Sequence, residues 1–324
     1  REVADTGARN VKLHLNPLLR SRLSPIGGMS SMRRTASHIF KTSGGEDEGL
    51  KHPFTMGDIC KEVIRPLMRR LPSRTMDNRR ILRPRSHHPS YAEIALSTNL
   101  KDSQGNAAFA TPATHFVSHV WDSSFLNFVE MLGNWLRMSG YPETAAYFWV
   151  DLFVVSQHTA RKVRLQTWWS SSFMQSIQAI GTTILVLDDW RQPHCLRRAW
   201  VLWEIYCTTV GGGRLELAIH PTAQEDLKDC LVSSFEEIRS VLHMPTVTEA
   251  DCEAFHRQDQ EMIQEEIEGT ITFPGLNQLV RGQLQRLLLQ VGWRMLEELK
   301  GKEKLSPVPA VRNERIRLQQ GLAA

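Results

Sequence analysis

The sequence predicts an α/β fold of the flavodoxin-like class, a doubly wound parallel sheet of four to five strands covered by helices. Four strand patterns alternate with three helix patterns between residues 115 and 219, and this alternation is typical of parallel sheets. Two of the strand patterns, at 147–155 and 182–187, are almost entirely apolar, as expected of strands that are covered on both faces. We expect a helical C-terminal cap after this core, and a partly disordered, basic N-terminal segment before it.

The composition indicates a globular protein with an uneven distribution of charge. Of 324 residues, 41% are hydrophobic and nine are Trp, which is enough for a sizeable core. Residues 1–90 carry 18 Lys and Arg against 8 Asp and Glu, a net charge of +10. Because the whole chain carries +4, residues 91–324 carry −6. The basic half is therefore the N-terminal segment and not the predicted sheet.

The cysteines favour an intracellular, cytoplasmic location. They are scattered, odd in number and without a CxxC pair, which is typical of reduced thiols and argues against a zinc site. We therefore expect no bound metal. No secretory signal pattern follows the first basic residues, and no run of eighteen apolar residues predicts a membrane-spanning helix. The five cysteines are Cys60, Cys195, Cys207, Cys230 and Cys252.

Residues 1–52 are predicted to be a disordered tail, because they are rich in Ser, Gly and Arg and contain few aromatic residues. Residues 53–109 are predicted to be a helical and basic lead-in. Thr55 is a candidate N-cap for its first helix, and Pro66 is expected to end or kink that helix. Arginines crowd residues 69–85, and such a segment can face an acidic partner or be a solvated connector. Without interleaved aromatic residues for base stacking, nucleic acid is not expected as a partner.

Residues 110–220 contain the predicted sheet. Gly140 and Gly181 are expected to end its first two helices. The stretch has neither a GxGxxG pattern after its first strand nor a P-loop, so a dinucleotide-binding fingerprint is not present. In chain order we expect a strand at 115–121, a helix at 125–136, a strand at 147–155, a helix at 168–180, a strand at 182–187, a helix at 196–207 and a strand at 215–219.

Residues 221–300 are predicted to be a helical C-terminal extension. Apolar residues recur at helical spacing in 223–242, 248–268 and 275–299, and we expect these helices to pack as a cap. The last residues, 301–324, are polar and are predicted to be a flexible tail.

Polar and aromatic side chains collect at the carboxyl ends of the predicted strands. In an open parallel sheet, ligands bind beyond these ends. Carboxylates there can hold ribose hydroxyls, and indoles can stack on a base. The candidate ligand-binding residues are Ser118, His119, Trp121 and Asp122 after the first strand, Asp151 in the second, Asp188 and Trp190 after the third, and Trp200 in the following helix.

Glu204 lies in the predicted helix 196–207, beside an apolar stripe. A carboxylate in such surroundings is partly desolvated, which tends to raise its pKa and to strengthen the electrostatic field that its charge exerts on neighbouring groups. It is either a catalytic acid or a structural acid paired with Arg197 or Arg198, and the residues leave both interpretations open. The stripe consists of Leu196, Trp200, Trp203 and Cys207 at i, i+4, i+7 and i+11.

Several motifs between residues 110 and 220, about a third of the chain, resemble the Toll/interleukin-receptor (TIR) family. Their combination is similar to a divergent TIR-like group of algae and other protists, whose helical flanks resemble residues 58–67 and 273–277. The stretch His115-Phe116-Val117-Ser118-His119 resembles the family's first strand, Trp149-Val150-Asp151 its second strand, Ser176–Leu187 its following helix and strand, and Trp200-Val201-Leu202-Trp203-Glu204-Ile205 the Trp-Cys-Leu-x-Glu-Leu motif of plant-type members.

The resemblance implies an intracellular signalling protein that self-associates through its TIR-like domain. In catalytic TIR domains, the Glu of this motif is needed to cleave the nicotinamide–ribose bond of NAD⁺, and the matching residue is Glu204. NAD⁺ would then be a substrate and not a cofactor. The alternative is a non-catalytic TIR-like module for assembly and protein interaction.

Overall fold

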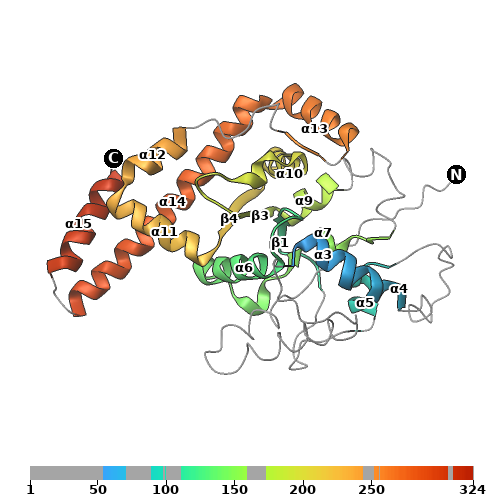
Figure 1. The fold of residues 1–324 in the computed structure, drawn as a ribbon, viewed down its shortest axis with the longest axis horizontal. Helices are drawn as coiled ribbons and strands as arrows, with labels where there is room; N and C mark the ends of the chain where they lie inside the picture. Colours follow the sequence, from blue (N-terminus) through green and yellow to red (C-terminus); the bar gives the residue numbers. More distant parts are fainter. Residues whose placement is uncertain are drawn as a thin grey trace, which may run out of the picture. The chain divides into compact units, whose positions relative to one another are not determined.

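The computed structural model describes most of the chain (Figure 1), as two compact units, residues 1–182 and residues 183–324. The predicted disordered tail over 1–52 falls outside the described residues, and so does the predicted arginine-rich surface over 69–85 except for its first two residues. The described ranges are 54–70, 89–97, 99, 111–158, 173–243, 252–254, 256–305 and 309–323.

The four strands form one parallel sheet in the order β2-β1-β3-β4. This order is that of flavodoxin-like sheets, in which the second and third strands lie on opposite sides of the first. The predicted α/β class, with a four-stranded parallel sheet and helices at the C-terminus, is therefore confirmed. The strands are β1 (His115–Ser118), β2 (Phe148–Trp149), β3 (Thr182–Leu187) and β4 (Arg214–Ile219).

An aromatic core holds β1 and β2 together. The two strands pair with His115 opposite Phe148 and Phe116 opposite Trp149. The ring of Phe116 stacks on Trp149 with 4.7 Å between the ring centroids. Phe173 meets both rings edge-on, an arrangement that favours aromatic attraction beyond simple burial. This packing fixes the place where the two strands end.

The second strand is much shorter than predicted. The sequence predicted a strand over 147–155, but β2 ends at Trp149, and a helical turn, α7 (Asp151–Val154), follows. Leu152 and Phe153 remain buried in this turn. The prediction was wrong because a short apolar run is equally compatible with a buried strand and a buried helix.

The helices α6 (Phe125–Ser139) and α9 (Met174–Ile180) end at the glycines that the sequence indicated. Gly140 has a φ of 66° and Gly181 a φ of 73°, in the left-handed region that glycine adopts without steric cost. The predicted start of the second helix, at residue 168, lies outside the described residues. The shorter helices of this unit are α5 (Tyr91–Ser97) and the 3₁₀ turn η3 (Glu143–Ala145).

Pro66 lies inside a continuous helical segment, so the prediction that it ends the helix was wrong, whereas a kink at Pro66 stays a prediction. The segment begins at Thr55, whose Oγ1 accepts from Asp58 N at 3.1 Å while its own N–H donates to Asp58 Oδ2 at 3.0 Å. In an α-helix, a proline ring clashes with the carbonyl four residues earlier. Here Glu62, four residues before Pro66, lies in a wider π-helical turn that ends at Ile64. The segment consists of α3 (Met56–Asp58), the π-helical η1 (Ile59–Ile64) and α4 (Arg65–Arg70).

The C-terminal helices are more extensive than predicted. The region 223–242 forms two helices that meet at Ser234. The prediction of a flexible tail over 301–324 was wrong for its described residues, because α15 packs on α11 and α14 and buries Leu318 completely. The helices of this unit are α10 (Ala199–Val210), α11 (Pro221–Ser233), α12 (Phe235–His243), α13 (Arg257–Thr270), α14 (Thr272–Leu305) and α15 (Pro309–Ala323).

Candidate functional site

A histidine, a tryptophan and an aspartate meet at the carboxyl ends of β1 and β2. β1 ends at Ser118, three residues before its predicted end, and His119 and Trp121 follow it in a loop. Asp151 begins α7, shortly after β2. His119 Nε2 lies 2.8 Å from Asp151 Oδ1, and Trp121 Nε1 donates to Asp151 Oδ2 at 2.8 Å. The structure thus brings together three of the predicted ligand-binding residues.

The neighbours of Asp151 keep its carboxylate ionised. Burial alone raises the pKa of a carboxyl group, but the attraction of His119 and the hydrogen bonds from His119, Trp121 and the N–H of Leu152 outweigh it. The pKa of Asp151 therefore lies below its ordinary value. Since an ionised carboxylate only accepts hydrogen bonds, Nε2 of His119 carries the proton in this contact.

The other predicted residues of this unit have different surroundings. The His119 side chain is 3% exposed, and within the described residues its Nδ1 has neither solvent contact nor a hydrogen-bond partner. The same holds for Ser118 Oγ among those residues, whereas Asp122 is exposed. In this part of the chain, neither Ser118 nor Asp122 joins the hydrogen bonds that link His119, Trp121 and Asp151.

In the second unit, α10 is buried on all sides and not along one stripe. Residues 201–208 are all buried, whereas Trp200 is only half-buried. Leu196 lies in a separate 3₁₀ turn, η5 (His194–Arg197), and Arg198 is extended between this turn and α10. The predictions of one helix over 196–207 and of a single apolar side were therefore wrong, and α10 is a core helix.

Glu204 is the only buried Asp, Glu, Lys or Arg among the described residues. It is 9% exposed, and its Oε2 atom has no solvent contact. Its backbone carbonyl accepts from Thr208 Oγ1 at 2.7 Å, and this hydroxyl lies 2.6 Å from Thr183 Oγ1 on β3. The two threonines therefore fix the turn that carries Glu204 to the neighbouring strand.

The surroundings of Glu204 are apolar and acidic. Burial raises the pKa of the Cys207 thiol far above its usual range, and the carboxylates of Glu204 and Glu266 add to this effect. Cys207 is thus an uncharged neighbour. Arg197 and Arg198 were the predicted partners of a structural acid, but the ion pairs within the described residues do not join either of them to Glu204.

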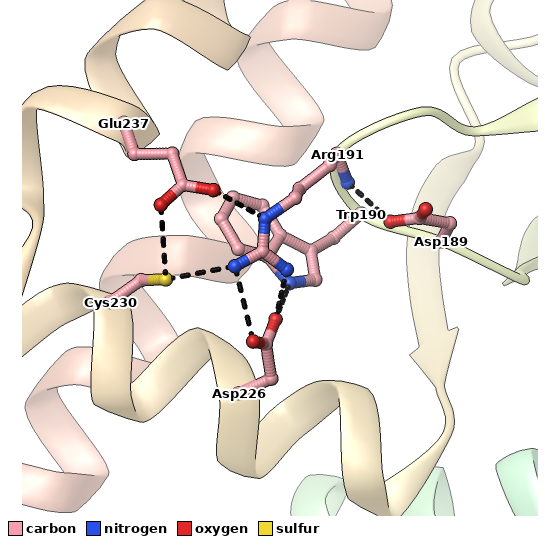
Figure 2. A network of polar contacts seen from close by, with 6 residues as sticks. All are labelled: Asp189, Trp190, Arg191, Asp226, Cys230 and Glu237. Atoms are coloured by element: carbon pink, nitrogen blue, oxygen red, sulfur yellow. Dashed lines mark hydrogen bonds and ion pairs between the residues drawn. The ribbon is translucent and has the colours of Figure 1, made fainter.

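Trp190, predicted to stack on a base, belongs to a charged network (Figure 2). The residue is 2% exposed, and its Nε1 donates to Asp226 Oδ2 at 2.9 Å. The guanidinium carbon of Arg191 lies 4.3 Å from the centroid of its ring, a cation–π distance. The indole N–H and one ring face are therefore already in use within the protein.

Arg191 fastens the loop after β3 to α11 and α12 (Figure 2). Its guanidinium makes two bonds to Asp226, and its Nε donates to Glu237 Oε1 at 2.5 Å. Nη2 lies 3.0 Å from Cys230 Sγ, and the backbone N–H donates to Asp189 Oδ1 at 2.8 Å. The hydrogen bonds raise the pKa of Arg191 and lower that of Asp226. Sequence reasoning missed this network because its bonded residues lie up to 46 positions apart and form no local pattern.

The remaining predicted residues of this unit are Asp188 and Trp200. Asp188 follows β3 directly, and its Oδ1 has neither solvent contact nor a hydrogen-bond partner among the described residues. Burial raises the pKa of the nearby Cys195 thiol, and the charge of Asp188 adds to this shift. Trp200 is half-buried in the first turn of α10. A role in ligand binding stays a prediction for both residues.

Comparisons with protein-family models, with curated proteins and with solved structures found no match to this chain. The TIR-like resemblance therefore rests on the sequence motifs. Over the described ranges, no group of three or more His, Cys, Asp and Glu side chains is placed to hold a metal ion. In the same ranges, none of the helices is both long and apolar enough to cross a membrane.

Proposed function

We propose that the protein is a TIR-like signalling protein that cleaves the nicotinamide–ribose bond of NAD⁺, with Glu204 as the essential carboxylate. The burial of Glu204 carries the proposal, since no other Asp, Glu, Lys or Arg among the described residues is buried. Taking a carboxylate out of water is costly, and such groups concentrate where their charge has a task. The Trp-x-x-x-Glu motif suggests which task this is.

The chemistry of the reaction suits such a carboxylate. Cleavage of the bond develops positive charge on the ribose in an oxocarbenium-like transition state. A carboxylate shielded from water interacts with this charge more strongly than an exposed one. Glu204 has the required shielding at 9% exposure. Because its Oε2 has no solvent contact, the reaction requires that substrate binding opens the side of the carboxylate that faces the ribose.

The proposal extends to the partners and the location of the protein. We propose that it self-associates through the TIR-like residues 110–220, and that its basic N-terminal segment meets an acidic partner. We place it in the cytoplasm, because its five cysteines are free thiols and that compartment keeps thiols reduced.

The decisive experiment follows nicotinamide release from NAD⁺ by the purified full chain, in dilute solution and with a crowding agent. We expect Glu204→Gln to lower the rate by roughly 10²- to 10³-fold, the range for a lost transition-state interaction. Glu266→Gln is the matched control, because Glu266 also influences Cys207 but is exposed on α13. Equal rates for Glu204→Gln and the wild type would refute the enzymatic proposal.

The second candidate is a non-catalytic assembly module. The absence of solvent contact at Glu204 Oε2 favours it, because a carboxylate that never meets substrate can serve packing alone. Sedimentation at increasing concentration, combined with the NAD⁺ assay, separates the two candidates. Assembly without nicotinamide release supports the module, and a strictly monomeric protein that cleaves NAD⁺ excludes it.

A further inference from the structure

Residues 54–70, which we call the strap, are fastened to the loop that follows β1. The contact consists of backbone hydrogen bonds and includes an antiparallel bridge between Thr55 and Ser124. It places the first turn of the helical segment directly on the loop that carries His119 and Trp121. The bonds run from Gly57 N to Trp121 O at 2.9 Å, from Met56 N to Ser123 O at 3.0 Å and from Phe125 N to Phe54 O at 2.9 Å.

The strap also contacts the segment that follows β2. The thiol of Cys60 donates to Gln157 Oε1 at 3.5 Å. His158 Nε2 donates to the carbonyl oxygen of Arg65 at 3.1 Å. The side-chain amide of Gln157 also donates to the carbonyl oxygen of Asp151 at 3.0 Å. The strap is thus connected to the loop that carries His119 and Trp121, and to the segment after α7, the helical turn that carries Asp151.

One face of the strap is buried along its whole length. Apolar residues recur every four positions and are at most 4% exposed, so this face is shielded from water. Burial of apolar side chains therefore adds to the hydrogen bonds in holding the strap in place. The buried residues are Met56, Cys60, Ile64 and Met68.

We propose that the strap is autoinhibitory: it covers the carboxyl ends of β1 and β2, and NAD⁺ reaches the His119–Trp121–Asp151 cluster only after the strap leaves them. The identity of the ligand rests on the proposed function. The position follows from the fold, because ligands of open parallel sheets bind at these ends. The strap supplies none of the four strands, so it can detach without breaking the sheet.

Trp121 links the strap to the cluster. Its carbonyl oxygen accepts from Gly57 N, and its indole donates to Asp151. A ligand group that takes the place of the indole at Asp151 therefore moves the residue to which the strap is attached. Under the proposal, a ligand that binds better to the open arrangement shifts the strap towards it.

The variant Gly57→Pro tests the proposal by removing one hydrogen bond between the strap and the loop after β1. Proline is tolerated in the first turn of a helix, but it removes the N–H that donates to Trp121 O and puts a ring carbon in its place. Gly57→Ala is the matched control, since it keeps the N–H. Its Cβ would lie 3.5 Å from Thr55 Oγ1 and 3.6 Å from Trp121 O, which are ordinary contacts.

Opening is measured by labelling of Cys60 with a maleimide and mapping by mass spectrometry, because this thiol is 1% exposed under the closed strap. We expect Gly57→Pro to label Cys60 and to release nicotinamide about five- to tenfold faster than Gly57→Ala, as the loss of one buried backbone hydrogen bond implies. Thr55→Ala, which removes the helix cap, should act in the same direction. It provides a second measurement if the proline variant does not fold.

The outcomes distinguish a failure of the strap proposal from a failure of the proposed function. Faster labelling of Cys60 and faster release of nicotinamide in Gly57→Pro and Thr55→Ala support the inhibitory role of the strap. Faster labelling at an unchanged release rate overturns it, and leaves the proposed function intact if Glu204→Gln is inactive. Equal labelling of Cys60 in Gly57→Pro, Thr55→Ala and Gly57→Ala also overturns it. If none of the variants, nor the wild type, cleaves NAD⁺, the proposed function and the inhibitory role of the strap fail together.

Discussion

Two loops, one in each unit, contain the same hydrogen-bonding pattern in different surroundings. In each, a tryptophan that follows a strand donates its indole N–H to a carboxylate, and a nitrogen side chain from the same loop binds that carboxylate too. The side chains of His119 and Asp151 are 3% and 28% exposed, whereas those of Arg191 and Asp226 are 33% and 45% exposed. In the first cluster, His119 and Trp121 follow β1 and bind Asp151 of α7; in the second, Trp190 and Arg191 follow β3 and bind Asp226 of α11.

The difference lies in how each carboxylate is held. His119 binds one oxygen of Asp151 through Nε2 and Trp121 binds the other, whereas the guanidinium of Arg191 alone binds both oxygens of Asp226. The bidentate Arg191–Asp226 pair keeps one geometry and holds the loop after β3 on α11.

The largest expected effect is that of Asp151→Asn. It removes the negative charge that binds a buried imidazole, so we expect the free energy of unfolding to fall by about 2–3 kcal/mol. Urea unfolding followed by circular dichroism measures this. Asp122→Asn, in the loop after β1 and exposed, should change stability by less than about 0.5 kcal/mol. Equal effects of the two variants would contradict the difference in burial.

A smaller effect is expected from Arg191→Lys. Lysine keeps the charge but cannot make the paired bonds to Asp226 or lie flat on Trp190. Because the network is partly exposed and screened by solvent, we expect a loss of about 1 kcal/mol in the same unfolding measurement. Arg239→Lys is the control, since Arg239 forms an exposed pair with Glu236 and should have almost no effect. A loss as large as that of Asp151→Asn would refute the comparison.

The pH dependence of Asp151 has a definite sign. Its pKa is lowered from the ordinary value of 3.8, so the ionised form stabilises the fold above that pH. This contribution is lost as the pH falls through the lowered pKa of the folded state. We expect the stability difference between wild type and Asp151→Asn to stay constant from about pH 5 upwards and to shrink below about pH 4. A difference that grows towards acid pH would show the opposite shift.

The smallest effect concerns salt. Exposed charge pairs are screened by ions, and buried pairs much less so. Because only His119 of the first pair is buried and Asp151 is 28% exposed, raising NaCl from about 0.1 M to 1 M should reduce the destabilisation caused by Arg191→Lys more than that caused by Asp151→Asn. Thermal unfolding of both variants and the wild type at the two salt concentrations provides the test. Equal sensitivity would place both clusters in similar dielectric surroundings.

The sequence predicted an element correctly where the residues within that element determine its conformation. Gly140 and Gly181 end their helices in the conformation that glycine allows, and β3 has the predicted bounds of Thr182–Leu187. The helical turn α7 could not be predicted, because tertiary packing decided between two conformations of one apolar run. The same holds for α15, a mostly polar helix whose packing depends on partners far away in the sequence.

The candidate site was predicted only in part. The rule that ligands bind at strand ends correctly grouped His119, Trp121 and Asp151. The strap was missed, because a pattern of apolar residues shows that a helix has a buried face but not which loops lie against it. For Trp190, the sequence left both base stacking and packing within the protein open, because neither Asp226 nor Arg191 is recognisable as its partner from spacing alone.

The close packing of α15 has a consequence for inheritance. Gly292 of α14 leaves room for Leu322, whose Cδ2 would lie only 2.5 Å from an added Cβ, and Gly321 approaches Phe235 in the same way. A stop codon after residue 308 would remove α15 and leave Gly292 and the adjoining faces of α11 and α14 without a cover. Such an allele would yield a chain prone to aggregation and degradation. An allele lost in this way would mimic a null mutation even though every residue proposed for NAD⁺ cleavage is still encoded.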